Sequence, residues 1–234
     1  MPASASCSEA GRPQAIVFDV DGTLVDTLPA VHSALNAVLG MAGHAAADHR
    51  LVRRHFSAGM HGLLQAALAA GDGVGDASRS TPVDPALEAA FGQAYLDRVA
   101  DLARPFDGVA AMLADLAGRG LRLGVCSNGA SAALQRMLSA FGWHSHFSMV
   151  VDAGNARALK PSPAPLQQVL QGLQVQPADA WLVGDSELDG RCARAAGCRF
   201  VWVACGYGGD EAAAMAHSRL ADPTDLPALL AGVG

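Results

Sequence analysis

Short apolar runs alternate with helical patterns along this chain, and this alternation limits the folds that it can adopt. Runs with almost no polar side chain favour parallel strands that are covered on both faces. They occur at residues 15–19, 121–126, 180–184 and 199–203, and a weaker run occupies residues 147–151. Strands that alternate with helices predict an α/β fold, a doubly wound parallel sheet with right-handed crossovers.

Helical spacing fills the segments between these runs. Apolar residues recur at positions i, i+3, i+4 and i+7 within residues 109–116, 134–141 and 166–173. Each of these segments also carries a signal that is typical of a helix end. The signals are Asp107 as an N-cap before the first segment, Gly142 as a C-cap glycine after the second, and Ser162 with Pro163 at the start of the third.

The stretch from about Leu28 to Arg104 interrupts the alternation, because it has helical patterns but no convincing strand. Its apolar stripes are Val31, Ala34, Leu35 and Val38; Leu63, Leu64, Ala67 and Leu68; and Leu87, Phe91, Ala94, Tyr95 and Val99. Residues 71–82 are rich in Gly, Asp and Ser and predict a loop, and because no strand precedes them they do not indicate a nucleotide or calcium site. The sequence therefore predicts a flexible tail at residues 1–13, an α/β core at residues 14–27 and 105–234, and an inserted helical unit at residues 28–104.

The composition opposes several classes of protein. With 22 acidic and 16 basic residues the net charge is −6, which argues against an extended nucleic-acid-binding surface. Hydrophobic residues make up 51% of the chain, and no run approaches the roughly 18 apolar residues of a membrane span. The N-terminus does not resemble a secretory signal, and the five cysteines lack C-x-x-C spacing. We therefore expect a cytoplasmic protein, a monomer or homodimer, with neither nucleic acid nor a membrane as partner.

Polar residues gather where the predicted strands end. In an open parallel sheet these carboxyl ends lie along one edge, and ligands bind there. The residues are Asp19 and Asp21 after the first run, Ser127, Asn128 and Gly129 after the second, Lys160 before the run at residues 180–184, and Asp185 and Asp189 after it. The sequence thus predicts a site with several carboxylates, one hydroxyl and one lysine.

This order of motifs resembles the haloacid dehalogenase-like superfamily. The motifs that carry the resemblance lie at residues 19–27, 160–166 and 184–189, and it extends from about residue 14 to residue 233. Within the superfamily the chain looks most like phosphoglycolate phosphatase-type enzymes, through residues 28–29, 59–64 and 205–208. The resemblance implies that residues 28–104 form a helical cap that closes over the site, with hinges near residues 23–28 and 103–106.

The two aspartates of the first motif suit covalent hydrolysis of a phosphate monoester. Asp19 would attack phosphorus and form an aspartyl phosphate, which splits a difficult reaction into two easier displacements. Asp21 would protonate the leaving oxygen and then deprotonate the water that hydrolyses the intermediate. Alternation along an extended chain places residues i and i+2 on the same side, so both carboxyls can face one substrate. The alternative is an ordinary solvated turn.

A cation is expected beside these carboxylates, because they would otherwise repel a phosphate dianion. Mg²⁺ prefers oxygen ligands and is the natural candidate. The resemblance implies that Asp19, the Asp21 main-chain carbonyl and Asp185 hold it. Asp189 would contact the metal or its water, or would only form a capping box with Ser186 at a helix start.

The remaining site residues would bind and neutralise the phosphoryl group. The Ser127 hydroxyl and the backbone N–H groups of Asn128 and Gly129 would donate to its oxygens. Lys160 would offset its charge and keep Asp19 ionised. In the cap, Arg53, Arg54, His55 and His61 are either solvated residues or, for one or two of them, readers of the substrate.

The sequence therefore predicts a Mg²⁺-dependent phosphatase that acts on a small phosphate ester, phosphoglycolate first and sugar phosphates next. A phosphomutase with the same nucleophile is the alternative, and only the shape of the cap separates the two. A dehalogenase is disfavoured by Asp21, because a departing halide needs no proton. A non-catalytic binding module is disfavoured because both Asp19 and Lys160 are present.

Overall fold

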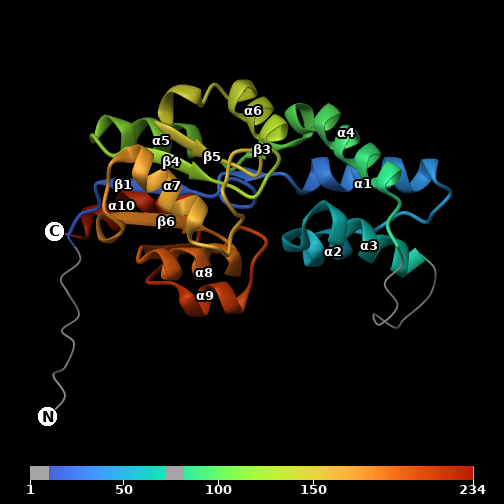
Figure 1. Ribbon diagram of the computed structural model, residues 1–234. Coiled ribbons are helices and arrows are strands. Elements are labelled where there is room, and N and C mark those ends of the chain that lie inside the picture. Colours follow the sequence, from blue (N-terminus) through green and yellow to red (C-terminus); the bar gives the residue numbers. More distant parts are fainter. Residues whose placement is uncertain (1–10, 72–81, 234) are drawn as a thin grey trace, which may run out of the picture.

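A six-stranded parallel sheet forms the centre of the computed structural model, which describes residues 11–71 and 82–233 (Figure 1). The strands, in their order across the sheet, are β5 (Met149–Val151), β4 (Arg122–Cys126), β1 (Ala15–Phe18), β6 (Ala180–Gly184), β7 (Arg199–Val203) and β8 (Ser218–Leu220). β1 pairs with β4 on one side and with β6 on the other, and all four of its residues are fully buried. The strand that carries the first motif therefore lies in the middle of the sheet.

Helices cover both faces of this sheet, and the alternation of side chains along β1 accounts for the two layers of core. Ile16 and Phe18 belong to a cluster with residues of α5 (Val109–Gly118), α6 (Ser131–Ala140) and α10 (Leu226–Ala231). Ala15 and Val17 point to the opposite face and join residues of α7 (Ala164–Leu173) and α8 (Glu187–Ala196). Helix α9 (Asp210–Met215) packs beside α8. The predicted doubly wound α/β fold is confirmed.

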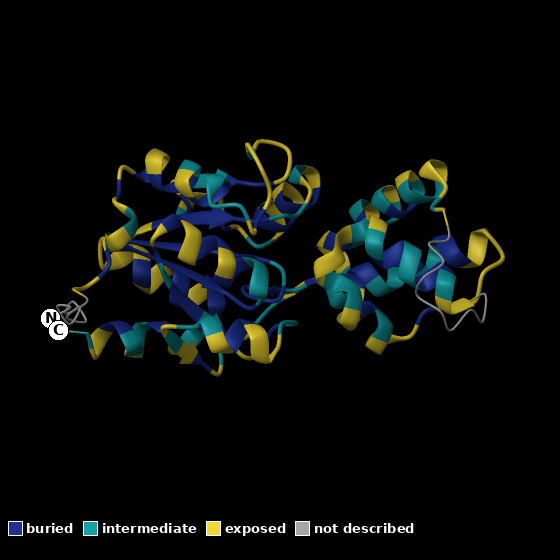
Figure 2. Ribbon diagram, turned by 60° about the horizontal axis from the view of Figure 1, so that its bottom comes forward, coloured by how far each residue is buried: buried dark blue, intermediate teal, exposed yellow. Residues whose placement is uncertain are grey.

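A separate helical lobe lies beyond the carboxyl ends of the strands, as Figure 2 shows. It consists of α1 (Leu28–Met41), α2 (His49–His55), a single 3₁₀ turn (Phe56–Ala58), α3 (Gly59–Gly71) and α4 (Pro85–Leu102). The predicted apolar stripes contribute Leu35, Leu64 and Phe91, all fully buried, to one hydrophobic cluster. Two chain segments join this lobe to the sheet, β2 (Val25–Asp26) and β3 (Arg104–Pro105), which pair antiparallel. We call this lobe the cap; its exact division from the core at residues 27–28 and 104–105 stays a prediction.

The helix ends agree with the sequence in part. The prediction that Asp107 is the N-cap of α5 is wrong, because the chain enters this helix through Gly108, whose φ is 81°. Gly142 follows the C-cap of α6 with a φ of 70°, as a C-terminal glycine does. Ser162 Oγ accepts a hydrogen bond of 3.2 Å from Ala164 N at the start of α7.

Several predictions concern parts of the chain outside the described residues. The predicted tail at residues 1–13 and the predicted loop at residues 71–82 lie largely there. Among the helices that are described, none is long and apolar enough to cross a membrane.

Candidate active site

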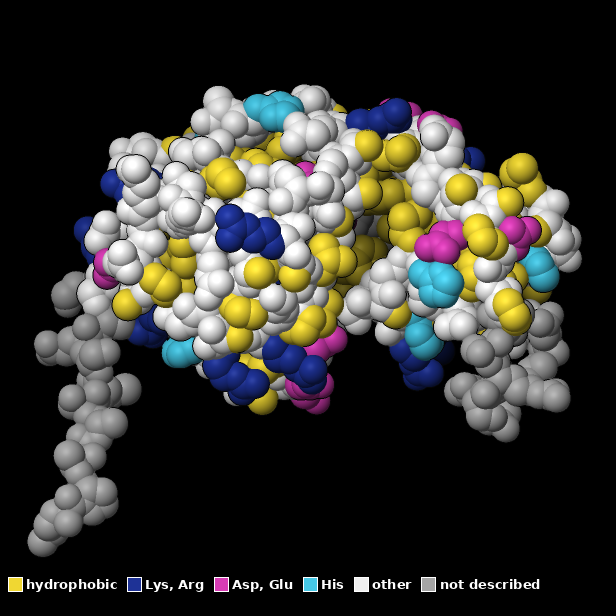
Figure 3. All heavy atoms as spheres, in the orientation of Figure 1, with side chains coloured by type: hydrophobic (Ala, Val, Ile, Leu, Met, Phe, Trp, Pro, Cys, Tyr) yellow, Lys and Arg dark blue, Asp and Glu magenta, His cyan; other side chains and the backbone are white. Residues whose placement is uncertain are grey.

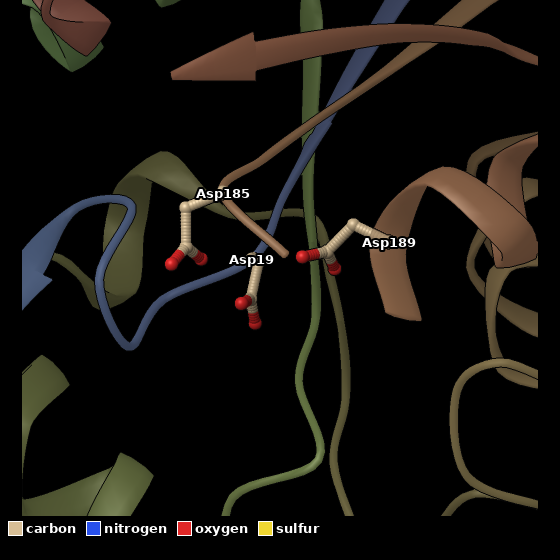
Figure 4. Close-up of side chains that lie close together, drawn as sticks. All are labelled: Asp19, Asp185 and Asp189. Atoms are coloured by element: carbon tan, nitrogen blue, oxygen red, sulfur yellow. The ribbon is translucent and has the colours of Figure 1, made fainter. Parts of the chain in front are cut away.

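The carboxyl ends of three neighbouring strands bring the predicted residues together. Asp19 directly follows β1, Ser127 follows β4 and Asp185 follows β6, and these strands are adjacent in the sheet. One carboxylate oxygen each of Asp19, Asp185 and Asp189 lies within 4.8 Å of the other two (Figure 4). Residues far apart in the chain thus meet because parallel strands end at the same edge.

A cleft of about 1580 Å³ opens between this edge and the cap. Asp19, Asp21 and Lys160 line its core side, and Arg53 and Phe56 are among the cap residues on the other side. Figure 3 shows hydrophobic side chains on the walls of the hollow between the two lobes. The cleft therefore combines a charged floor with largely apolar walls, which is typical of a binding site for a small molecule.

Lys160 links two of the site carboxylates. Its Nζ donates to Asp19 Oδ1 at 2.8 Å and to Asp189 Oδ1 at 2.6 Å, and the residue is 5% exposed. Burial opposes the charge on this lysine, but the adjacent Asp189 and Asp19 outweigh it and raise the pKa of Lys160 well above its usual range. The lysine therefore carries a positive charge beside Asp19, and its role in catalysis stays a prediction.

Asn128 holds the chain that carries Lys160. Its Oδ1 accepts from Lys160 N at 2.8 Å, and its Nδ2 donates to Lys160 O at 2.9 Å. Sequence reasoning considered only the main-chain N–H of Asn128, and it missed this contact because the two residues come from different loops. The side chain of Asn128 thus orients the lysine.

Asp189 makes the predicted capping box and also contacts Lys160. Its Oδ2 accepts from Ser186 N at 3.0 Å and from Ser186 Oγ at 2.6 Å, while its Oδ1 faces the lysine. Both oxygens of Asp189 are thus engaged, and the residue is fully buried. A contact of Asp189 with a metal or its water stays a prediction.

The Asp185 carboxylate is fixed by hydrogen bonds from two directions. Oδ1 accepts from Thr23 Oγ1 at 3.2 Å, and Oδ2 accepts from Tyr207 N at 2.6 Å and Gly208 N at 3.2 Å. Burial, together with the charge of Asp189, raises the pKa of Asp185 to about 6, although the two N–H groups act in the opposite direction. A bound cation would remove much of this cost.

Burial also raises the pKa values of the two aspartates of the first motif. The pKa of Asp19 lies well above its usual range because of burial, which the charge of Lys160 opposes. Asp21 borders the cleft, and burial raises its pKa too. A raised pKa suits the acid–base role predicted for Asp21, because such a group must be protonated part of the time near neutral pH.

The loop after β4 joins this cluster. Ser127 is buried, and its Oγ accepts from Gly129 N at 2.9 Å. A Cβ atom on Gly129 would lie 3.0 Å from Ser127 Oγ and 3.2 Å from Asp21 Oδ2, so the first two motifs come into contact here. The phosphate-binding roles of Ser127, Asn128 and Gly129 stay predictions.

The cap residues singled out from the sequence divide into two groups. Arg53, Arg54 and His55 line the cleft. His61 instead lies 2.8 Å from Glu88 in an exposed pair between α3 and α4, and it is not among the residues that line the cleft. Sequence reasoning missed Tyr207, which borders the cleft; its only signal was its place in the motif at residues 205–208.

Comparison with known proteins agrees with this geometry. The family model for haloacid dehalogenase-like hydrolases matches residues 16–203. The phosphoglycolate phosphatase of Rhodospirillum rubrum is 35% identical over 204 residues, which cover 87% of this chain and 84% of that protein.

Solved structures show the same fold. A predicted phosphoglycolate phosphatase from Haemophilus somnus superposes with a TM-score of 0.84 at 27% identity, covering 92% of this chain and 97% of that one. The β-phosphoglucomutase of Clostridium difficile has a TM-score of 0.71 at 19% identity, covers 92% of this chain and 93% of its own, and shows the fold alone. The chain belongs to the haloacid dehalogenase-like hydrolase family, and the resemblance predicted from its motifs is confirmed.

Proposed function

We propose that this protein is a Mg²⁺-dependent phosphatase that hydrolyses a small phosphate monoester through an aspartyl phosphate in the cytoplasm. The observation that carries the proposal is the buried pair of Lys160 with Asp19 at the floor of the cleft, 2.8 Å apart. The charge of Lys160 opposes the protonation that burial favours at this carboxylate, and an ionised carboxylate is what can attack phosphorus. The similarity to a phosphoglycolate phosphatase supports the same reaction.

The residues of this chain divide the reaction into two displacements. In the first, an Asp19 oxygen forms a bond to phosphorus as the bond from phosphorus to the leaving oxygen breaks, and Asp21 gives its proton to that oxygen. In the second, Asp21 takes a proton from water, whose oxygen bonds to phosphorus and releases Asp19. Lys160 lies beside both displacements and offsets the charge on the phosphoryl oxygens.

The acidic set fits a magnesium ion. Asp19 and Asp185, which belong to one carboxylate cluster, and the Asp21 main-chain carbonyl would hold it. They offer the hard oxygen ligands that Mg²⁺ prefers. When bound, the ion supplies positive charge that offsets the repulsion between these carboxylates and a phosphate dianion. Lys160 is shared between two carboxylates, so without such an ion the floor of the cleft carries more negative than positive charge.

Phosphoglycolate is the first substrate to test, because the relative from Rhodospirillum rubrum is named as a phosphoglycolate phosphatase. The cleft also has room for larger substrates such as sugar phosphates. The test is phosphate release from a panel of phosphate monoesters with Mg²⁺ present, and the Asp19→Asn variant, purified in parallel, detects contaminating phosphatase. Release that requires Asp19 supports the proposal, and no release from any ester contradicts it. Isomerisation of a hexose phosphate without net release of phosphate would indicate the phosphomutase instead.

A further inference from the structure

The loop that follows β7 is in direct contact with the Asp185 carboxylate. Tyr207 N and Gly208 N both donate to Asp185 Oδ2, at 2.6 and 3.2 Å. A Cβ atom on Gly206 would lie only 2.2 Å from Asp185 Cβ, so the loop approaches this residue as closely as a glycine permits. Any shift of the loop therefore changes the surroundings of the carboxylate.

The side chain of Tyr207 extends from this loop to the junction of core and cap. Its hydroxyl donates to Asp26 Oδ1 at 2.8 Å and accepts from Thr27 N at 2.6 Å and Leu28 N at 3.2 Å. Helix α1 begins here, and the Thr27 side chain does not cap it within the described part of the chain. The first N–H groups of a helix need an acceptor. A tyrosine 180 residues away in sequence supplies one, and Asp26 Oδ1 also accepts from Leu28 N at 3.2 Å.

The cap touches the same loop from its other side. Arg53 Nη2, on α2, donates to Gly206 O at 2.6 Å, and its guanidinium carbon lies 5.9 Å from the centre of the Tyr207 ring. The ring of Phe56, in the turn after α2, lies 4.6 Å from that of Tyr207. One short loop is therefore bound at three points: the carboxylate, the hinge and the cap.

We propose that Tyr207 is a positioning residue that couples the seating of the cap to the placement of the Asp185 carboxylate. The proposal rests on the proposed function, because it takes Asp185 to be a metal ligand. When the cap is seated, Arg53 and Phe56 hold the tyrosine, and its main-chain N–H holds Asp185. When the cap lifts, the loop loses these contacts and the carboxylate becomes freer, so the metal binds less tightly. Coupling between two events is reciprocal, and the bound metal therefore favours the seated cap.

The first test measures Mg²⁺ affinity by titration calorimetry on metal-free protein without substrate. Tyr207→Phe removes the hydroxyl but keeps the ring, and Arg53→Met removes the contact from the cap. We expect each variant to bind Mg²⁺ at least about fivefold more weakly, the lower end of typical coupling between sites. The double variant should bind Mg²⁺ only slightly less tightly than the single variant with the lower affinity, because both changes break the same link.

Arg54→Met is the matched control for Arg53→Met. It removes the same charge from the neighbouring position of α2, and Arg54 also lines the cleft. Loss of a positive charge alone favours a bound cation. The control should therefore bind Mg²⁺ as tightly as the wild type or more tightly, which is the opposite of the effect expected for Arg53→Met.

The second test measures amide hydrogen exchange at residues 27 and 28 in the wild type and in Tyr207→Phe. Mg²⁺ should slow exchange at these amides in the wild type and have less effect in the variant. Arg53 is exposed, so Arg53→Met should fold even if Tyr207→Phe does not. Equal Mg²⁺ affinity in the wild type and in folded Arg53→Met would overturn the coupling while leaving the phosphatase intact. A wild type that binds no Mg²⁺ would overturn the proposed metal site, and this inference with it.

Discussion

Lys160 is the residue on which the charge balance of the site depends. It is buried between Asp19 and Asp189, and Lys160→Ala would leave these carboxylates without their cation. Turnover should fall at least about a hundredfold, the typical loss for one electrostatic group in an active site. Lys160→Arg should recover only part of it, because a planar guanidinium presents its charge differently from an ammonium.

Stability has to be measured together with this activity. Removing one partner of a buried ion pair costs about 3–5 kcal/mol, so thermal unfolding of Lys160→Ala should occur well below that of the wild type. Assays therefore belong at a temperature at which circular dichroism shows the variant to be folded. Near-wild-type turnover of folded Lys160→Ala would show that the lysine does not contribute to catalysis.

The effect of replacing Asp21 should depend on how much protonation the leaving group needs. Asp21→Asn should lower turnover by about 10²–10⁴-fold on an alkyl phosphate, the usual contribution of general acid–base catalysis. On p-nitrophenyl phosphate the first step should suffer less, because that leaving group needs little protonation, and phosphoenzyme should accumulate. Rapid-quench measurement of the first step on both substrates tests this. Equal losses on the two would mean that Asp21 is not the acid.

At the scale of elements, the loop after β7 allows a prediction with a close control. A Cβ atom on Gly206 would lie 2.2 Å from Asp185 Cβ and 2.4 Å from Gly22 O, so Gly206→Ala must displace the backbone next to a site carboxylate. We expect most of the Mg²⁺ binding and activity to be lost. Gly209→Ala, three residues on, meets no atom within 4 Å and should behave as the wild type. Titration calorimetry and turnover of the two variants make the comparison, and full activity of Gly206→Ala would contradict the loop's role.

The elements also show what the sequence can predict. β1 and β6 are buried throughout and β4 and β7 largely so, and such strands appear as apolar runs. β8 is missed because it is a three-residue edge strand with one buried residue. Helix α2 is missed because only Val52 of its seven residues is buried, which leaves no stripe to detect.

Part of the candidate site can likewise be predicted from the sequence, and part cannot. The grouping of Asp19, Ser127 and Asp185 is predictable, because parallel strands share an edge and each motif follows a strand. The contact of Tyr207 with Asp26 is not, since it depends on how the cap docks on the core and joins residues 181 positions apart.

For the molecule as a whole, the metal-free protein should lose stability as the pH rises through the window from about 4 to about 6. Asp185 has a pKa of about 6 in the folded chain, whereas an unfolded aspartate titrates near 3.9. Between these pH values the folded state binds more protons than the unfolded state. The stability that this protonation contributes is therefore fully present below about pH 4 and is lost as the pH rises past about 6. The raised pKa values of Asp19 and Asp21 act in the same direction.

Mg²⁺ should reverse this loss, because the cation takes the place of the protons. Thermal unfolding with Mg²⁺ or with a chelator should therefore show a larger stabilisation at pH 7.5 than at pH 5. Asp185→Asn is the control, and it should lose most of the Mg²⁺ effect at both pH values. An equal Mg²⁺ shift at the two pH values in the wild type would place the binding elsewhere.

The two strands that join the lobes have a consequence for how such a protein can diversify. Val25 pairs with Pro105 and Asp26 with Arg104, so the chain leaves the core and returns to it at adjacent positions. A different helical insertion could replace the cap between β2 and β3 without altering any crossover connection of the sheet. The residues at the strand ends would stay the same. Only the contacts between Tyr207 and the new cap would have to evolve again.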